Sequence, residues 1–139
     1  GMSMGYDVSP NILTTAIFAF IVVAGSEEFV KYVFLRGYIY NHDEFDEPLD
    51  GIVYAVMIGM GFATAENVLY ATNYGLQTTI VRAFTAVPAH GAFAVIMGYY
   101  VGLAKFSDWS KVSFLAQGLI GAIVLHGAYD FFIFQKKWN

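Results

Sequence analysis

The chain is divided into four long apolar segments separated by short polar stretches. Each segment is close to the ~20 residues that an α-helix needs to cross a bilayer. Apolar side chains occur all the way round each helix and do not form one stripe, which is typical of helices surrounded by lipid. The pattern predicts an all-α, polytopic integral membrane protein, a bundle of about four transmembrane helices. The segments cover residues 11–35, 51–73, 78–104 and 112–134.

The amino-acid composition supports this fold class and excludes several others. The 139 residues are 58% hydrophobic and only 13% charged, whereas an average soluble domain has roughly 25% charged residues. The absence of cysteine excludes a disulfide scaffold, a thiolate zinc site and cysteine catalysis. The net charge of -4 argues against nucleic acid as a partner. The length fits a single domain over residues 1–139, and Gly1 ahead of Met2 is interpreted as the remnant of a purification tag.

The most polar stretch lies between the first and second segments. Residues 42–50 read HDEFDEPLD and carry five of the eleven acidic residues of the chain. The simplest interpretation is a solvated acidic loop, with His42 solvated among the carboxylates. A cation site, or a gate over the membrane opening, is the alternative.

The most informative feature is a set of ionisable and amide side chains inside the apolar segments. A charge at the bilayer centre costs roughly 2.5–3.5 kcal/mol even on a lenient scale, so these groups should face one another or a water-filled cavity. At ~1.5 Å per residue, Glu27 lies about 15 Å from the membrane side that bears the acidic loop. Glu66, His90 and His126 lie about 22 Å from the same side, so we expect one cluster. The full set is Glu27, Glu28, Lys31, Glu66, Asn67, Arg82, His90, His126 and Asp130.

Spacing along the helices pairs several of these groups. Glu27 and Glu28 precede Lys31 by four and three residues, so either carboxylate can pair with it on one helix face. Asp130 follows His126 by one turn and can orient or charge the imidazole. The sequence therefore predicts two local ion pairs that belong to the same cluster.

The third segment contains a proline and a pair of glycines with expected structural roles. Pro88 cannot donate to the carbonyl of Phe84 and should kink the segment beside His90. Gly98 and Gly102 form a GxxxG step, which lets helices approach closely. We expect plain helix packing at these glycines.

Four short motifs on successive segments resemble the PrsW family of bacterial and archaeal intramembrane proteases, which are related to the CAAX prenyl protease superfamily. EExxK and FxxxEN, in this order and on successive spans, are specific together. The likeness covers the chain from about residue 26 to residue 132 and implies cleavage of a membrane-anchored, anti-sigma-factor-like protein in a prokaryotic cell membrane. The motifs read EEFVK at 27–31, FATAEN at 62–67, PAH at 88–90 and HGAYD at 126–130.

The resemblance also implies roles for individual residues, because the broader superfamily uses a glutamate and histidines to activate water. By that likeness Glu27 is the leading base candidate, with Glu28 next to it. Glu66 stands where the CAAX proteases carry a histidine in their FxxxH motif. His126 and Asp130 are similar to their HxxxN motif, but an ionised Asp only accepts hydrogen bonds, so a simple oxyanion-donor role does not suit Asp130.

The resulting expectation is hydrolysis of a peptide bond without a metal or other cofactor. A Glu27 or Glu28 carboxylate takes a proton from water. His126 or His90 shares the proton transfer or binds the oxyanion. Supporting roles are expected for four other residues. Lys31 poises the carboxylate pair, and Asn67 is a donor to the oxyanion or backbone. Asp130 orients His126, and Arg82 is a buried partner for a carboxylate.

Two alternatives stay open at this point. His90, His126 and a glutamate would make a two-histidine, one-carboxylate zinc site with an open fourth position, although no HExxH motif is present. Intramembrane Glu, His and Asp chains also serve proton or ion pathways, although no broken-helix inverted repeat is evident. The partners expected in either case are the lipid bilayer and, for a protease, a membrane-anchored protein or peptide.

Overall fold

The structure is a computed structural model that describes residues 11–138, with side chains described for residues 11–133. Gly1, interpreted above as a tag remnant, lies outside the described residues. Within residues 11–138 all regular secondary structure is helical, in α or π (η) geometry. The elements are α1 (Ile12–Ile17), η1 (Phe18–Gly25), α2 (Ser26–Tyr32), η2 (Val33–Ile39), α3 (Pro48–Tyr74), α4 (Leu76–Phe84), α5 (Ala86–Phe106) and α6 (Lys111–Trp138).

Four helical stretches of the described chain are long and apolar enough to cross a membrane, which confirms the predicted fold class. Each corresponds to one of the apolar segments, and their ends lie within a few residues of the predicted ones. The stretches are Ile12–Ile39, Pro48–Tyr74, Leu76–Phe106 and Lys111–Ile133.

The first span alternates between α and π geometry, which the apolar pattern did not indicate. Turns of π-helix are wider than α turns and often occur at functional sites. Ser26, at the start of α2, donates to the carbonyls of Val22 at 2.5 Å and Val23 at 3.2 Å. Such bonds back to the preceding turn often bend helices. The short α2 section, between η1 and η2, carries all three charged residues of the EExxK motif.

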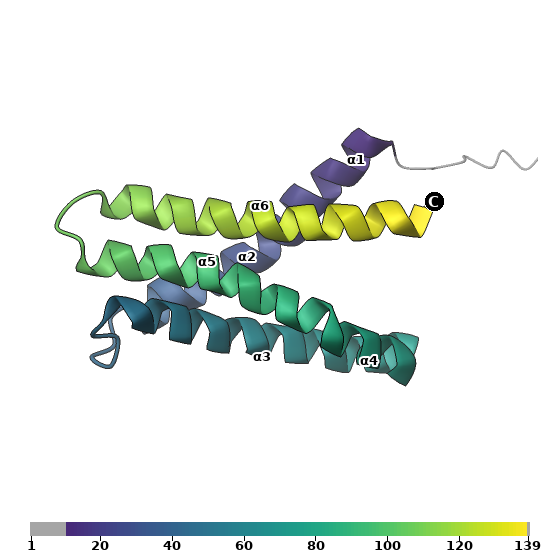
Figure 1. The fold of residues 1–139 in the computed structure, drawn as a ribbon, viewed down its shortest axis with the longest axis horizontal. Helices are drawn as coiled ribbons and strands as arrows, with labels where there is room; N and C mark the ends of the chain where they lie inside the picture. Colours follow the sequence, from purple (N-terminus) through teal and green to yellow (C-terminus); the bar gives the residue numbers. More distant parts are fainter. Residues whose placement is uncertain (1–10, 139) are drawn as a thin grey trace, which may run out of the picture.

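The helices form a layer of three that a fourth helix crosses. Figure 1 shows α3, α5 and α6 side by side, with α5 in the middle. The first helix crosses behind this layer: its α1 and η1 sections pack on α6, and its η2 section packs on α3. The α2 section lies at the crossing and contacts both α6 and α3. The charged residues of the first span are therefore placed against the middle of the layer.

A buried aromatic residue anchors the acidic loop at one end of the bundle. Phe45 is only 1% exposed. Lys105 of α5 donates to the Phe45 carbonyl at 2.6 Å, and its Nζ lies 4.5 Å from the centroid of the Phe45 ring. His42 is exposed, and its nearest carboxylate, that of Glu44, is 3.8 Å away. These positions agree with the solvated loop, since four of its five acids, Asp43, Glu44, Asp46 and Glu47, are exposed, while Asp50 is half-buried.

The third span is interrupted at Thr85, which separates α4 from α5. The predicted segment over 78–104 lies within one membrane-spanning stretch, Leu76–Phe106, but its helix is not continuous. Phe84 is the last residue of α4, and Pro88 lies in the first turn of α5. Pro88 has no N–H for the Phe84 carbonyl, so α4 ends there, and a proline is tolerated in a first turn where that N–H would be unpaired. The predicted kink beside His90 is thus a complete break one turn earlier.

The packing of α3 against α5 depends on glycines at their closest approach. A side chain at Gly98 would collide with the carbonyl of Gly51, and its Cβ would lie 2.7 Å from the Cα of Ile52. A side chain at Gly102 would collide with the carbonyl of Pro48. Since backbone atoms cannot move aside as a flexible side chain can, the predicted packing role of the GxxxG step is confirmed.

We expect Gly98→Val to destabilise the protein by about 1–3 kcal/mol or more, because the added methyl groups force α3 and α5 apart. The measurement is thermal unfolding in detergent micelles. Gly61→Ala is the matched control, since no atom lies within 4 Å of a Cβ at that helical position, and alanine there should leave stability unchanged or slightly higher. An equal loss at both positions would contradict the close helix approach.

Candidate active site

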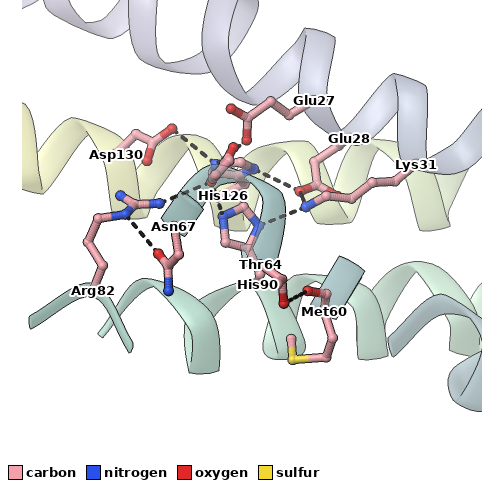
Figure 2. A network of polar contacts seen from close by, with 11 residues as sticks. Glu27, Glu28, Lys31, Met60, Thr64, Asn67, Arg82, His90, His126 and Asp130 are labelled. Atoms are coloured by element: carbon pink, nitrogen blue, oxygen red, sulfur yellow. Dashed lines mark hydrogen bonds and ion pairs between the residues drawn. The ribbon is translucent and has the colours of Figure 1, made fainter. Parts of the chain in front are cut away.

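Polar side chains from all four spans meet beside α2, in the middle of the helix layer. Figure 2 shows them pointing towards one another from different helices. The cluster predicted from helix depth therefore forms. It contains Glu27, Glu28 and Lys31 from α2, Glu66 and Asn67 from α3, Arg82 from α4, His90 from α5, and His126 and Asp130 from α6.

His126 is 2% exposed and meets a carboxylate at each ring nitrogen. Its Nδ1 lies 2.7 Å from Oε1 of Glu28. Its Nε2 lies 3.1 Å from Oδ2 of Asp130 and 3.6 Å from Oε2 of Glu27. The ring stacks on Phe93, with 4.6 Å between centroids and 12° between the planes. These contacts hold the imidazole in one orientation, and the predicted ion pair with Asp130 is confirmed.

His90 is 4% exposed and has different partners at its two nitrogens. Its Nδ1 lies 2.8 Å from Nζ of Lys31, and its Nε2 lies 3.2 Å from Oε2 of Glu66. A carboxylate oxygen of Glu27 lies within 4.8 Å of a ring nitrogen of each histidine. Both histidines therefore lie beside the carboxyl group of Glu27.

A buried ion pair lies between the Nδ1 atoms of the two histidines. Nζ of Lys31 lies 2.8 Å from Oε1 of Glu28, the same oxygen that meets His126. Glu28 is 0% exposed and Lys31 2% exposed. The sequence allowed either glutamate to pair with Lys31, and the structure assigns the ion pair to Glu28, whereas Glu27 faces His126.

The cluster opens to its surroundings on the side of Glu27 and Glu66. Their side chains are 28% and 21% exposed, and that of Asp130 is 14% exposed. Water can approach these carboxyl groups, whereas Glu28 is sealed within the protein. Exposure therefore distinguishes Glu27 from Glu28, two adjacent glutamates that the sequence motif does not separate.

Arg82 of α4 forms an ion pair with the carboxylate of Glu66. Its Nη2 donates to Oε2 of Glu66 at 3.1 Å, and its Nε donates to Oδ1 of Asn67 at 3.2 Å. The guanidinium also lies 3.8 Å from the centroid of the Tyr70 ring, a cation–π contact. The predicted role of Arg82 as a partner for a carboxylate is confirmed. Asn67, predicted as a donor to the oxyanion or backbone, places its amide oxygen on Arg82.

The charges of the cluster do not balance while the histidines are neutral. Four carboxylates face two cationic side chains, Lys31 and Arg82, which leaves two excess negative charges. Buried charge of this kind must be neutralised. Oε2 of Glu28 also has no hydrogen-bond partner among the described residues. Two bound protons, or one divalent cation, would restore the balance.

Three of the side chains are arranged as metal ligands would be. Glu27, His90 and His126 each offer one ligand atom, and these atoms lie within 4.8 Å of one another. At His126, Glu28 accepts from Nδ1, as a carboxylate commonly does behind a metal-ligating histidine. At His90 the corresponding place is taken by the amine of Lys31. The donor set thus fits a metal at His126 and Glu27 better than at His90.

Sequence reasoning missed Phe93, whose ring stacks on His126. It lies three residues after His90 on α5 and is 2% exposed. An apolar residue in an apolar helix carries no signal that separates a ring supporting the site from an ordinary core residue. The contact of Lys31 with His90 was missed as well, because it joins residues on different spans.

Comparisons with known proteins agree with the motifs. The model of a family described as "PrsW family intramembrane metalloprotease" matches residues 3–139. Protease PrsW of Geobacillus kaustophilus (strain HTA426) is 43% identical over 129 residues, which cover 92% of this chain and 57% of that relative. Protease PrsW of Bacillus subtilis (strain 168) is 44% identical over 108 residues, covering 77% and 50%. No solved structure is a match for this chain.

The chain spans about half the length of the curated relatives it matches. Its four helices are long and apolar enough to cross a bilayer, and these relatives come from bacteria. It is therefore an integral membrane protein of the bacterial cell membrane.

Glu28→Ala should destabilise the protein much more than Glu27→Ala. Removing one partner of a buried ion pair leaves an unpaired charge and costs about 3–5 kcal/mol, whereas Glu27 is partly exposed. Unfolding of both variants in the same detergent provides the measurement, and Glu28→Gln, which keeps an acceptor for His126, should lose less. Equal losses for the two alanine variants would contradict the assignment of Glu28 as the buried member.

Proposed function

Because this chain belongs to the PrsW family of intramembrane proteases, we propose that it hydrolyses a peptide bond in a membrane-anchored protein. The observation that carries this proposal is the partly exposed carboxyl group of Glu27, which faces His126 at 3.6 Å within the bundle. The substrate class that the sequence resemblance implies is an anti-sigma-factor-like protein. The cluster lies inside the apolar spans, so a substrate segment reaches it only after local unwinding exposes its backbone.

Glu27 is the general base of the proposed reaction. A base must lie within hydrogen-bond reach of the water that it activates, and Glu27 is on the open side of the cluster whereas Glu28 is sealed. The Glu27 carboxylate takes a proton from water, and the water oxygen attacks the carbonyl carbon of the scissile peptide. The proton then passes to the leaving nitrogen as the C–N bond breaks, giving a new carboxyl group and a new amine.

The histidines support this sequence of proton transfers. His126 and His90 share the proton transfer with Glu27 or donate to the oxyanion that forms on the carbonyl oxygen when water adds to the carbonyl carbon. A single oxyanion donor is worth about 10²–10³-fold in rate, and acid–base assistance about 10²–10⁴-fold. Arg82 holds the carboxylate of Glu66 at 3.1 Å, so this carboxylate keeps a fixed position on the α3 side of the site.

A metal-dependent version is the second candidate, favoured by the donor set and by the two excess negative charges. Glu27, His90 and His126 would hold a zinc ion as two imidazoles and one carboxylate, which is a common catalytic ligand set. When bound, such an ion would activate water and polarise the substrate carbonyl. We propose the metal-independent version first, since Lys31 lies at the His90 nitrogen where a metal-ligating histidine usually has an acceptor.

Glu27→Gln should lower kcat by at least ~10²-fold, because the amide cannot accept the proton from water. The assay is cleavage of a membrane-anchored reporter reconstituted with the purified protein in liposomes. Gln117→Ala, at an exposed position of α6 remote from the cluster, is the control and should cleave at the wild-type rate. A Glu27→Ala/Glu28→Ala double variant that still cleaves at near the wild-type rate would overturn the proposal.

Dialysis against EDTA should leave cleavage unchanged if residues alone activate the water. Metal content measured on the same samples provides the control for complete removal. Activity that disappears with the metal and returns on addition of Zn²⁺ alone would establish the metal-dependent candidate in its place.

A further inference from the structure

The buried ion pair between Glu28 and Lys31 has a consequence for which nitrogen of each histidine carries a proton. Oε1 of Glu28 meets Nδ1 of His126 at 2.7 Å, and Nζ of Lys31 meets Nδ1 of His90 at 2.8 Å. Both histidines thus turn the same ring nitrogen towards the ion pair. The two members of the ion pair have opposite hydrogen-bonding chemistry, so the histidines cannot respond in the same way.

A carboxylate only accepts hydrogen bonds, and an ammonium group only donates them. Nδ1 of His126 must therefore carry a proton to bond Glu28. Nδ1 of His90 must instead be unprotonated to accept from Lys31. The Glu28 carboxylate, 2.8 Å from Nζ, accepts a hydrogen bond from Lys31. Burial of all four residues, at 0–4% exposed, keeps out water that could otherwise satisfy either nitrogen.

We infer that Lys31 is a positioning residue that fixes His90 as the tautomer protonated on Nε2 in the metal-free protein, opposite to the tautomer that Glu28 favours at His126. The Nε2–H of His90 then donates to Glu66, 3.2 Å away, on the open side of the cluster. The Nε2 of His126 stays available to exchange a proton with Glu27 and Asp130. One ion pair on one helix turn thus gives two histidines different chemistry.

The tautomer assignment deepens the proposed function, and its meaning for catalysis rests on that function. With the proton on Nε2, His90 is the histidine that can donate to the oxyanion, in place of its contact with Glu66, and His126 is the partner of Glu27 in proton transfer. The sequence expectation left these two roles interchangeable between the histidines. The choice follows from the donor and acceptor chemistry behind each ring.

The tautomers are measurable without any substrate, because the protonated and unprotonated nitrogens of a neutral imidazole have well-separated ¹⁵N resonances. The chain has only three histidines, so His42→Gln removes the loop signal and leaves two to assign. The sample is the 139-residue chain labelled with [¹⁵N]histidine in micelles after dialysis against EDTA. We expect His90 to be protonated on Nε2 and unprotonated on Nδ1, and His126 to be protonated on Nδ1.

Two substitutions separate the effect of Lys31 from general damage. Lys31→Arg keeps a pure donor and should keep the His90 pattern, whereas Lys31→Gln offers either a donor or an acceptor and should give a mixture of both His90 tautomers. A wild-type His90 protonated on Nδ1, or a Lys31→Gln spectrum identical to that of wild type, would overturn the inference. If Lys31→Gln does not fold, the wild-type spectrum still decides.

The activity readout distinguishes this inference from the proposed function. Lys31→Gln should lower kcat by ~10²-fold with little change in KM, since the lost donor acts on the oxyanion and not on substrate binding. Lys31→Arg should recover part of that loss. A wild-type protein that cleaves no membrane-anchored protein would defeat the proposed function, whereas the tautomer assignment is decided by the spectra alone.

Discussion

The ion pair between Glu28 and Lys31 is the interaction on which the arrangement of the site depends. Neither residue is more than 2% exposed, and each also contacts a histidine on another helix. A buried ion pair stabilises a fold only when further hydrogen bonds satisfy its members. Here those bonds come from His90 on α5 and His126 on α6. The pair therefore ties the crossing helix to the layer, and the layer in turn makes the pair tolerable inside a membrane.

The glycines of α3 and α5 provide the geometry that this interaction needs. Because Gly51 and Gly98 allow direct backbone contact, α3 lies close enough to α5 for Glu66 to reach His90 at 3.2 Å. The helix is interrupted at Thr85, and α4 packs on both α3 and α5. Arg82 of α4 contacts Glu66 of α3 at 3.1 Å. Small residues and a helix break thus place charged groups that are far apart in sequence.

The excess of negative charge connects this architecture to chemistry. Four carboxylates against two cations require bound protons or a divalent cation. The metal-independent version of the proposed reaction moves protons among these groups, and the metal-dependent version would bind a divalent cation. The partly exposed members, Glu27 and Glu66, lie on the open side of the cluster, and the sealed members lie behind the histidines. The division into an open and a closed side follows from the first helix crossing the layer at α2.

The sequence by itself determined the four spans and the identity of the cluster. Apolar length fixes which segments enter a bilayer, and the cost of charge in lipid forces Glu27, Glu66, His90 and His126 to converge. The hydrogen bond missing at Pro88 likewise predicted an interruption near His90. Only the tertiary structure decided that Glu28 is sealed while Glu27 is open, and that Lys31 meets His90. Adjacent residues of one helix turn point in different directions, and their partners depend on helix crossing angles that local spacing does not encode.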